Sequence, residues 1–159
     1  METILDILEN DARTAPEVIG QMMNKSADEV RQLIKKYEDE KIILGYKAII
    51  DNDRANRNFV RAIIEVKVTP EREGGFDRIA ERIAKFDEVQ SCYLMSGAYD
   101  LLVMLEGEDL KHVARFVSEK LSPIDGVIST STHFMLKPYK ERGTIFIQEE
   151  GGERLKVSP

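Results

Sequence analysis

The sequence has very little of what metal sites and disulfides require. Its 159 residues include a single cysteine, Cys92, two histidines, His112 and His133, and no tryptophan. One cysteine cannot form an internal disulfide, and these three side chains lack the ligand spacing of a zinc site. The sequence therefore predicts no metal, no cofactor and no catalytic centre, and Cys92 is expected to be a buried free thiol.

Long apolar runs are also missing. The amino terminus lacks the basic-then-apolar order of a secretory signal, and the apolar stretches are too short to cross a bilayer. With 42% hydrophobic and 33% charged residues, the composition is that of an ordinary soluble protein. These features predict a cytoplasmic protein that does not bind membranes.

Positive charge is scarce as well. The net charge is -6, and residues 1–47 contain seven basic and ten acidic side chains. Non-specific DNA binding depends on phosphate neutralisation by Lys and Arg, so this chain is not expected to coat nucleic acid. Any contact with DNA must be local.

Three short helical patterns open the chain. The first covers residues 2–9, and the second begins at Pro16, which suits the first turn of a helix. Ser26 and Glu29 form the Ser-x-x-Glu capping box of a third helix. Its apolar positions fall on one side and its polar positions broadly opposite. Followed by the extended stretch KIILGYKAII, this order predicts a winged helix-turn-helix, with a three-helix packing or dimerisation module as the alternative.

After the turn-forming stretch DNDRANRN, the pattern changes to strands and helices in alternation. Apolar residues alternate over 60–68, recur at helical spacing over 76–86, and alternate again over 88–96 and 99–107. A helix at 110–121 and a strand at 126–137 complete the order β-α-β-β-α-β. This is the ferredoxin-like unit, an antiparallel sheet with both helices on one side, so the predicted fold class is α+β.

One face of that sheet is left without helices, although Leu102 and Met104 point apolar groups toward it. A second copy of the sheet is the simplest cover, which predicts a homodimer. The predicted domains are 1–50 for DNA binding, 51–58 for a linker, 59–148 for the ferredoxin-like domain and 149–159 for a polar tail. The segment GTIFIQ is a candidate extra edge strand.

Four stretches in this order resemble the Lrp/AsnC family of feast/famine transcription regulators over roughly the whole chain. They are LDILENDART, SADEVRQLIKKYEDEKIILGYKAIID, SGAYDLLVMLEGEDL and GVISTSTHFMLK. The resemblance implies an amino-terminal DNA-binding domain for promoter or operator DNA. It also implies a carboxy-terminal domain that forms dimers and often octamers, and that senses amino acids or related metabolites in clefts between subunits.

The third helix departs from the family pattern at three positions. Glu29 stands where Thr, Ser or Arg is common, Leu33 where Arg is common, and Lys41 where Gly is common. Arg31 is then the best placed residue for a bidentate guanine contact. Asp28 can accept from cytosine, Gln32 can pair with adenine, and lysines can reach phosphates. The predicted DNA-binding residues are Lys25, Asp28, Arg31, Gln32, Lys35 and Lys36.

For the effector, the resemblance indicates the hairpin turn Gly97, Ala98, Tyr99 and Asp100 with the facing residues Thr130 and Thr132. A carboxylate such as Asp100 can bind an ammonium, and backbone N–H groups of a glycine-containing turn can bind a carboxylate. The alternative is that Gly97 only provides the positive φ of a tight hairpin.

Two other functions fit the same architecture. One is a metabolite sensor or assembly protein that does not bind DNA. The other is a subunit similar to sirohaem decarboxylase, which would need converging Arg and His around a tetrapyrrole, and this sequence shows no such basic cluster. The sequence favours a DNA-binding regulator over both, and over an enzyme.

Overall fold

The computed structural model describes residues 3–70 and 75–146. The chain divides into two compact units, with the boundary between Ala48 and Ile49. The predicted polar tail, 149–159, lies outside the described residues. Within the described part, no helix is long and apolar enough to span a membrane.

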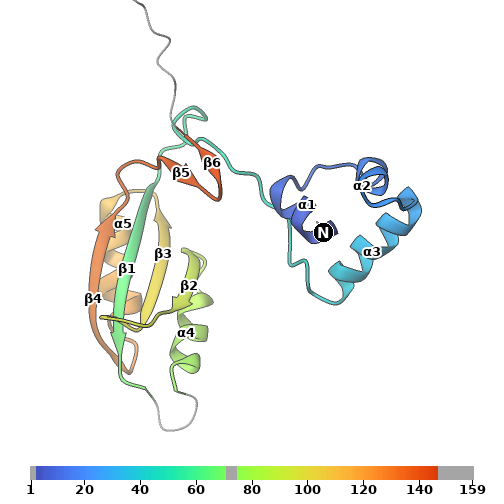
Figure 1. Cartoon of the computed structure of the whole chain (residues 1–159). Helices are drawn as coiled ribbons and strands as arrows, with labels where there is room; N and C mark the ends of the chain where they lie inside the picture. Colours follow the sequence, from blue (N-terminus) through green and yellow to red (C-terminus); the bar gives the residue numbers. More distant parts are fainter. Residues whose placement is uncertain (1–2, 71–74, 147–159) are drawn as a thin grey trace, which may run out of the picture. The chain divides into compact units, whose positions relative to one another are not determined.

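The first unit is a bundle of three helices, α1 (Ile4–Asn10), α2 (Pro16–Met23) and α3 (Ala27–Asp39) (Figure 1). The capping box of α3 is confirmed, because the Ser26 hydroxyl accepts from the Glu29 N–H and the Glu29 carboxylate accepts from the Ser26 N–H. A second capping box, which was not predicted, begins α1 at Thr3 and Asp6. Hydrogen bonds from Thr3 lower the pKa of Asp6. The core comprises Ile4, Ile7, Leu8, Ile19 and Val30.

The turn between α2 and α3 is tight. Asn24 adopts the left-handed conformation with φ 54°, and the Lys25 N–H donates to the Gly20 carbonyl at 2.8 Å. Gly20 is buried, and a Cβ placed there would lie 2.6 Å from the Lys25 carbonyl oxygen. Only a residue without a side chain allows the backbone of the turn to pass this close to α2.

The segment assigned to the wing, residues 44 to 50, has no regular secondary structure and does not form a strand. Its first residues fold back on α3, since the N–H groups of Ile42 and Ile43 both donate to the Tyr37 carbonyl, and Ile43 packs against the core. Leu44 and Tyr46 are exposed. A strand requires a hydrogen-bonded neighbour, and no second strand lies beside this segment among the residues described in the first unit.

The second unit contains the predicted β-α-β-β-α-β order. Its elements are β1 (Val60–Val68), α4 (Asp77–Ala84), β2 (Val89–Leu94), β3 (Leu101–Gly107), α5 (Leu110–Arg115) and β4 (Val127–Phe134). The strands form one antiparallel sheet in the order β2-β3-β1-β4. Both helices lie on the same side of the sheet in Figure 1. The ferredoxin-like prediction is therefore confirmed.

Alternation along the strands builds the core between sheet and helices. In β1 the residues Ala62, Ile64, Val66 and Val68 are buried, as predicted, and they meet Ile79 and Ile83 of α4 and Val113 of α5 in one cluster. Cys92 of β2 pairs with Val103 and packs against this core while remaining half-buried. Burial raises the pKa of its thiol.

The predicted single helix at 110–121 is interrupted. α5 ends at Arg115, and residues Phe116–Leu121 form η1, a turn of π-helix. Phe116 is buried edge-on against Phe86, and the Lys120 ammonium lies 5.7 Å from the Phe86 ring centre. Periodicity alone does not distinguish a π-turn from an α-helix, because the change adds only one residue to the repeat.

Lys120 also donates a hydrogen bond to Glu88, and this contact lowers the pKa of the Glu88 carboxyl. Because the folded-state pKa lies below the usual glutamate value of about 4.3, the stabilisation is fully present above that pH and is lost as pH falls through the lowered pKa. We expect Lys120→Met to cost about 0.5–1 kcal/mol at pH 7 and less below pH 4. Urea unfolding at several pH values measures this difference, and a cost that is constant with pH would contradict the assignment.

As far as residue 146, the candidate edge strand GTIFIQ does not join the main sheet. Its described part forms β6 (Thr144–Ile145), which pairs with β5 (Lys140–Glu141) in a separate hairpin. Arg61 of β1 connects this hairpin to the sheet, donating to Glu106 at 2.8 Å and to Glu141 at 3.0 Å. The turn between β5 and β6 has positive φ at both Arg142 (45°) and Gly143 (86°), and it pairs β6 with β5 rather than with a strand of the main sheet.

Candidate DNA-binding and effector-binding surfaces

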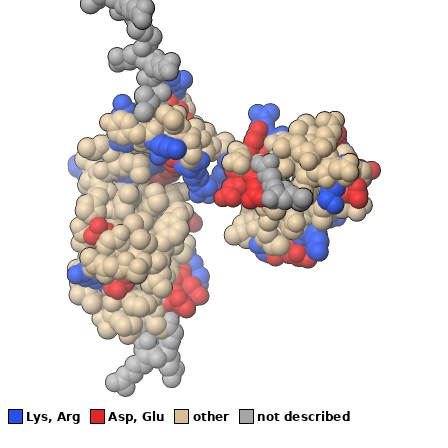
Figure 2. Space-filling model, viewed as in Figure 1, with Lys and Arg blue, Asp and Glu red and all other residues tan. Residues whose placement is uncertain are grey.

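The side chains predicted to contact DNA share one property in the first unit, which is exposure to solvent. All six are exposed: Lys25, Asp28, Arg31, Gln32, Lys35 and Lys36. The opposite side of α3 is occupied by Val30, Leu33, Ile34 and Tyr37, which pack on the core as the helical wheel predicted. On the face of this unit that Figure 2 shows, acidic and basic atoms are interspersed.

Arg31 is the most constrained of the six. Its Nη1 donates to Asp28 Oδ1 at 2.7 Å, and its Nη2 donates to a carboxylate oxygen of Glu17. Glu17 belongs to the first turn of α2, so this ion pair joins the two helices of the motif. No sequence pattern predicts this ion pair, because Glu17 and Arg31 are fourteen residues apart and neither helical nor strand spacing relates them.

The lysines differ in their surroundings. Lys36 lies 3.7 Å from Glu40 one turn later on α3, a weak pairing between exposed groups. Lys25 sits in the turn before α3, and Lys35 follows Arg31 by one helical turn on the exposed face. Each can move toward a phosphate without opening the core, because none of the three side chains is buried.

The hairpin turn between β2 and β3 contains the other predicted site. Gly97 has φ 146°, a conformation that favours glycine, and the Met95 N–H donates to the Asp100 carbonyl. The Asp100 carboxylate accepts a hydrogen bond from the Val68 N–H at 2.9 Å, and its own N–H donates to the Val66 carbonyl. Asp100 therefore continues the β1–β3 pairing beyond the end of the strand, a structural role that the sequence did not indicate.

Thr130 and Thr132 do not lie beside this turn within one chain. They pair with Val66 and Ile64 on the far side of β1, and alternation places them on the helix side of the sheet. Since Asp100 bonds to Val66 from the β3 side, Asp100 and Thr130 are separated by the width of β1, about 10 Å. One subunit alone does not bring the two halves of the predicted site together.

The hydrogen bond of Asp100 gives a stability expectation. Asp100→Ala should lower the free energy of unfolding by about 1–2 kcal/mol, because a half-buried N–H of β1 loses a charged acceptor. Asp100→Asn retains an oxygen acceptor and should cost less than half as much. Thermal unfolding of both variants checks this, and equal stability of Asp100→Ala and the unchanged protein would show that the bond contributes nothing.

The sheet face without helices combines apolar and polar rows. Ile63 of β1 pairs with Met104 of β3, and the next row contains Tyr93, Leu102, Glu65 and Ser131. His133 Nε2 lies 3.4 Å from both Glu65 Oε1 and Ser131 Oγ. Tyr93 is half exposed. This face therefore has an apolar centre on β1 and β3 with hydrogen-bonding groups along β4.

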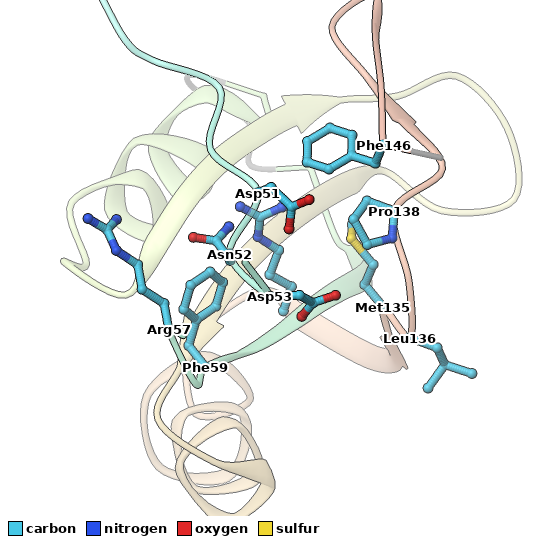
Figure 3. A pocket seen from close by; sticks show the side chains of 10 residues that line it. Asp51, Asn52, Asp53, Arg57, Phe59, Met135, Leu136, Pro138 and Phe146 are labelled. Carbon is cyan, nitrogen blue, oxygen red and sulfur yellow. The ribbon is translucent and has the colours of Figure 1, made fainter. Parts of the chain in front are cut away.

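A cavity of about 90 Å³ lies elsewhere in the second unit, where the turn at residues 51–57 meets the start of β1 and the β5–β6 hairpin (Figure 3). Phe59, Pro138 and Phe146 contribute apolar walls, and Asp51 and Asp53 contribute carboxylates. Arg61 also lines the cavity, and its guanidinium already forms ion pairs with Glu106 and Glu141. None of the residues predicted to bind an effector lines this cavity.

Comparisons with known proteins agree with this geometry. Residues 61–145 match the family model described as the Lrp/AsnC ligand binding domain. The chain is 48% identical to the uncharacterized HTH-type transcriptional regulator YugG of Bacillus subtilis, over 98% of this chain and 95% of the relative. It is 31% identical to the HTH-type transcriptional regulator LrpA of Pyrococcus abyssi, over 86% of this chain and 94% of the relative.

Among solved structures, the chain is similar to the transcriptional regulator NMB0573 of Neisseria meningitidis, determined as a complex with L-Met. The TM-score is 0.68 and the identity 25%, over 87% of this chain and 88% of that chain. These proteins are named as transcriptional regulators and not as enzymes.

Proposed function

This chain belongs to the Lrp/AsnC family of helix-turn-helix transcriptional regulators, and on that basis we propose that α3 reads promoter DNA while the second unit binds an amino acid or a related metabolite. The observation that carries the proposal is the exposed polar face of α3 in a tight helix-turn-helix. The regulator is proposed to act in the cytoplasm. The sirohaem decarboxylase alternative is set aside, since the relatives are named as regulators.

The DNA-contacting residues divide into two groups. Arg31, Gln32 and Asp28 are proposed to meet base edges from the first half of α3, because the amino-terminal part of a recognition helix enters the major groove. Lys25, Lys35 and Lys36 are proposed to contact phosphates. Base contacts determine sequence preference, whereas phosphate contacts determine salt dependence.

DNA binding is tested by fluorescence anisotropy on a fragment of the protein's own promoter. Lys36→Ala should weaken all sequences about equally and reduce the slope of log K against log salt by about one per site. Lys111→Ala, an exposed lysine on α5, is the matched control and should leave binding unchanged. If the unchanged protein does not retain the fragment at low salt, the sensor or assembly function without DNA binding replaces this proposal.

Assembly through the open sheet face is also part of the proposal. Two copies that pack this face together would cover Leu102, Met104, Ile63 and Tyr93, and larger assemblies such as octamers would then contain an even number of subunits. A dimer presents two α3 helices, which can bind two half-sites on the same duplex. Binding of the two helices together increases the overall affinity, even where each helix alone binds weakly.

The effector is proposed to lie where two subunits meet. One carboxylate oxygen of Asp100 accepts from the Val68 N–H, and the other is proposed to accept from the ammonium of the amino acid. The backbone N–H groups of Gly97, Ala98 and Tyr99 are proposed to bind the carboxylate of the same ligand. Thr130 and Thr132 lie across β1 within one chain, so they are proposed to reach the ligand from another subunit.

A thermal-shift screen against the twenty amino acids tests the sensor. A ligand at 100 times its dissociation constant stabilises the native state by about 2.7 kcal/mol. Asp100→Asn is the informative variant, because it retains an acceptor for Val68 and removes the charge that an ammonium needs. The shift should fall strongly in this variant. An unchanged shift would place the effector elsewhere, and the cavity at Phe59 and Phe146 would be examined next.

A further inference from the structure

Arg31 is held by two carboxylates in the protein without DNA, one from each helix of the helix-turn-helix. We propose that Glu17 acts as an intramolecular competitor of DNA: it keeps the Arg31 guanidinium in an ion pair until a DNA site that binds Arg31 strongly displaces the Glu17 carboxylate. The inference rests on the proposed reading role of α3, and it adds a residue of α2 that determines how tightly and how selectively that helix binds.

The competition follows from the donors that both partners need. A guanine presents two acceptors, O6 and N7, to the paired N–H groups at the end of an arginine. In this structure Nη1 donates to Asp28 and Nη2 donates to Glu17, so both terminal nitrogens already have a carboxylate partner. Arginine has five N–H donors, so the two carboxylates do not use them all; they compete with a base edge because they fix the orientation of the guanidinium and add negative charge beside it.

Glu17 is held in place by the backbone. It lies in the first turn of α2, immediately after Pro16, and the tight turn at Gly20 and Asn24 fixes α2 against α3. Asp28 is different, because its side chain is 85% exposed and it neighbours Arg31 on the same helix. Glu17 is 55% exposed and reaches Arg31 from the other helix. Glu17 is therefore the partner whose position depends on the fold of the motif.

The charges around Arg31 predict that α3 binds DNA weakly. Two carboxylates around one guanidinium leave this cluster at net negative charge on the surface proposed to face DNA. A phosphate approaching Arg31 thus meets repulsion from the carboxylates. The cluster should disfavour non-specific DNA more than a cognate site, because a phosphate brings negative charge next to the two carboxylates, whereas a guanine edge offers two uncharged acceptors.

The test compares Glu17→Gln with Glu9→Gln on the promoter fragment. Both remove one negative charge from the first unit, but Glu9 is an exposed residue of α1 that forms none of the ion pairs recorded for Arg31. Glu17→Gln should raise DNA affinity about three- to tenfold, and Glu9→Gln less than twofold. The gain should be larger on unrelated DNA than on the cognate site, which lowers the specificity ratio.

A double-mutant cycle with Arg31→Ala separates the mechanisms. If Glu17 acts through Arg31, the gain from Glu17→Gln disappears when Arg31 is absent. A gain that persists without Arg31, or an affinity that falls in Glu17→Gln, overturns the inference. The inference is also overturned if the unchanged protein binds DNA and Glu17→Gln and Glu9→Gln change its affinity equally. Failure of every protein to bind DNA would contradict the proposed function itself. The melting temperatures of the variants confirm that each is folded.

Discussion

Leu102→Glu is expected to leave the protein monomeric while its second unit stays folded. Leu102 lies on the open sheet face, between Glu65 of β1 and Tyr93 of β2, and its side chain is only half-buried in one chain. A carboxylate at this position would be buried against the second copy and would stand beside the carboxylate of Glu65. An unpaired buried charge costs several kcal/mol, more than a dimer of moderate affinity can offset.

Light scattering measures this outcome, and circular dichroism shows whether the fold remains. The control is Leu110→Glu, because Leu110 is 56% exposed on α5 and does not lie on the open face. That variant should retain the mass of the unchanged protein. A monomeric unchanged protein, or a Leu102→Glu variant of unchanged mass, would show that the open face is not the interface.

Gly20→Ala should destabilise the first unit by about 1–3 kcal/mol and abolish retention of DNA at 37 °C. Alanine in a helix is normally favoured over glycine by about 1 kcal/mol, so the intrinsic propensity acts in the opposite direction. The contact decides the sign, because the new Cβ would lie 2.6 Å from a backbone oxygen of Lys25. That backbone cannot retreat easily, since the Lys25 N–H is bonded to the Gly20 carbonyl.

Hydrogen exchange resolves the effect by unit. Amides of α2 and α3 should lose protection, while β1 and β3 should retain it. Gly45→Ala is the matched control, because a Cβ there would meet no atom within 4 Å. The control should change stability by less than about 0.5 kcal/mol. Equal protection in both variants would mean that the turn can relax around an added methyl group.

The features that the sequence predicted correctly are those with a local or periodic cause. Ser26 and Glu29 are three residues apart and cap each other, and the alternation from Ala62 to Val68 decides which face of β1 is buried. Thr3 and Asp6 have the same spacing and also cap each other, but Asp at the third helical position does not match the Ser/Thr-x-x-Glu pattern of the capping box. Periodicity also predicted the order of strands and helices along the second unit, because apolar residues recur every second position in a strand and at helical spacing in a helix.

The features that the sequence did not predict depend on contacts between distant residues. The pairing of Glu17 with Arg31 exists only because the turn at Gly20 brings α2 against α3. The bond from Val68 to Asp100 exists only because β1 extends two residues past Val66, the last residue of β1 that pairs with β3. In both cases a polar side chain that reads as a ligand-binding group in the sequence already has a partner within the chain.

Cys92 provides a built-in kinetic probe of the sheet. It is the only cysteine of the chain, it lies half-buried on an edge strand, and its raised pKa keeps the thiol protonated and slow to react at neutral pH. Labelling reagents therefore react fastest when β2 detaches from β3. The labelling rate at this single residue reports the free energy of this local opening. Any ligand that binds the β2–β3 hairpin and stabilises its pairing should slow the labelling of Cys92 in proportion to the fraction of protein that has ligand bound.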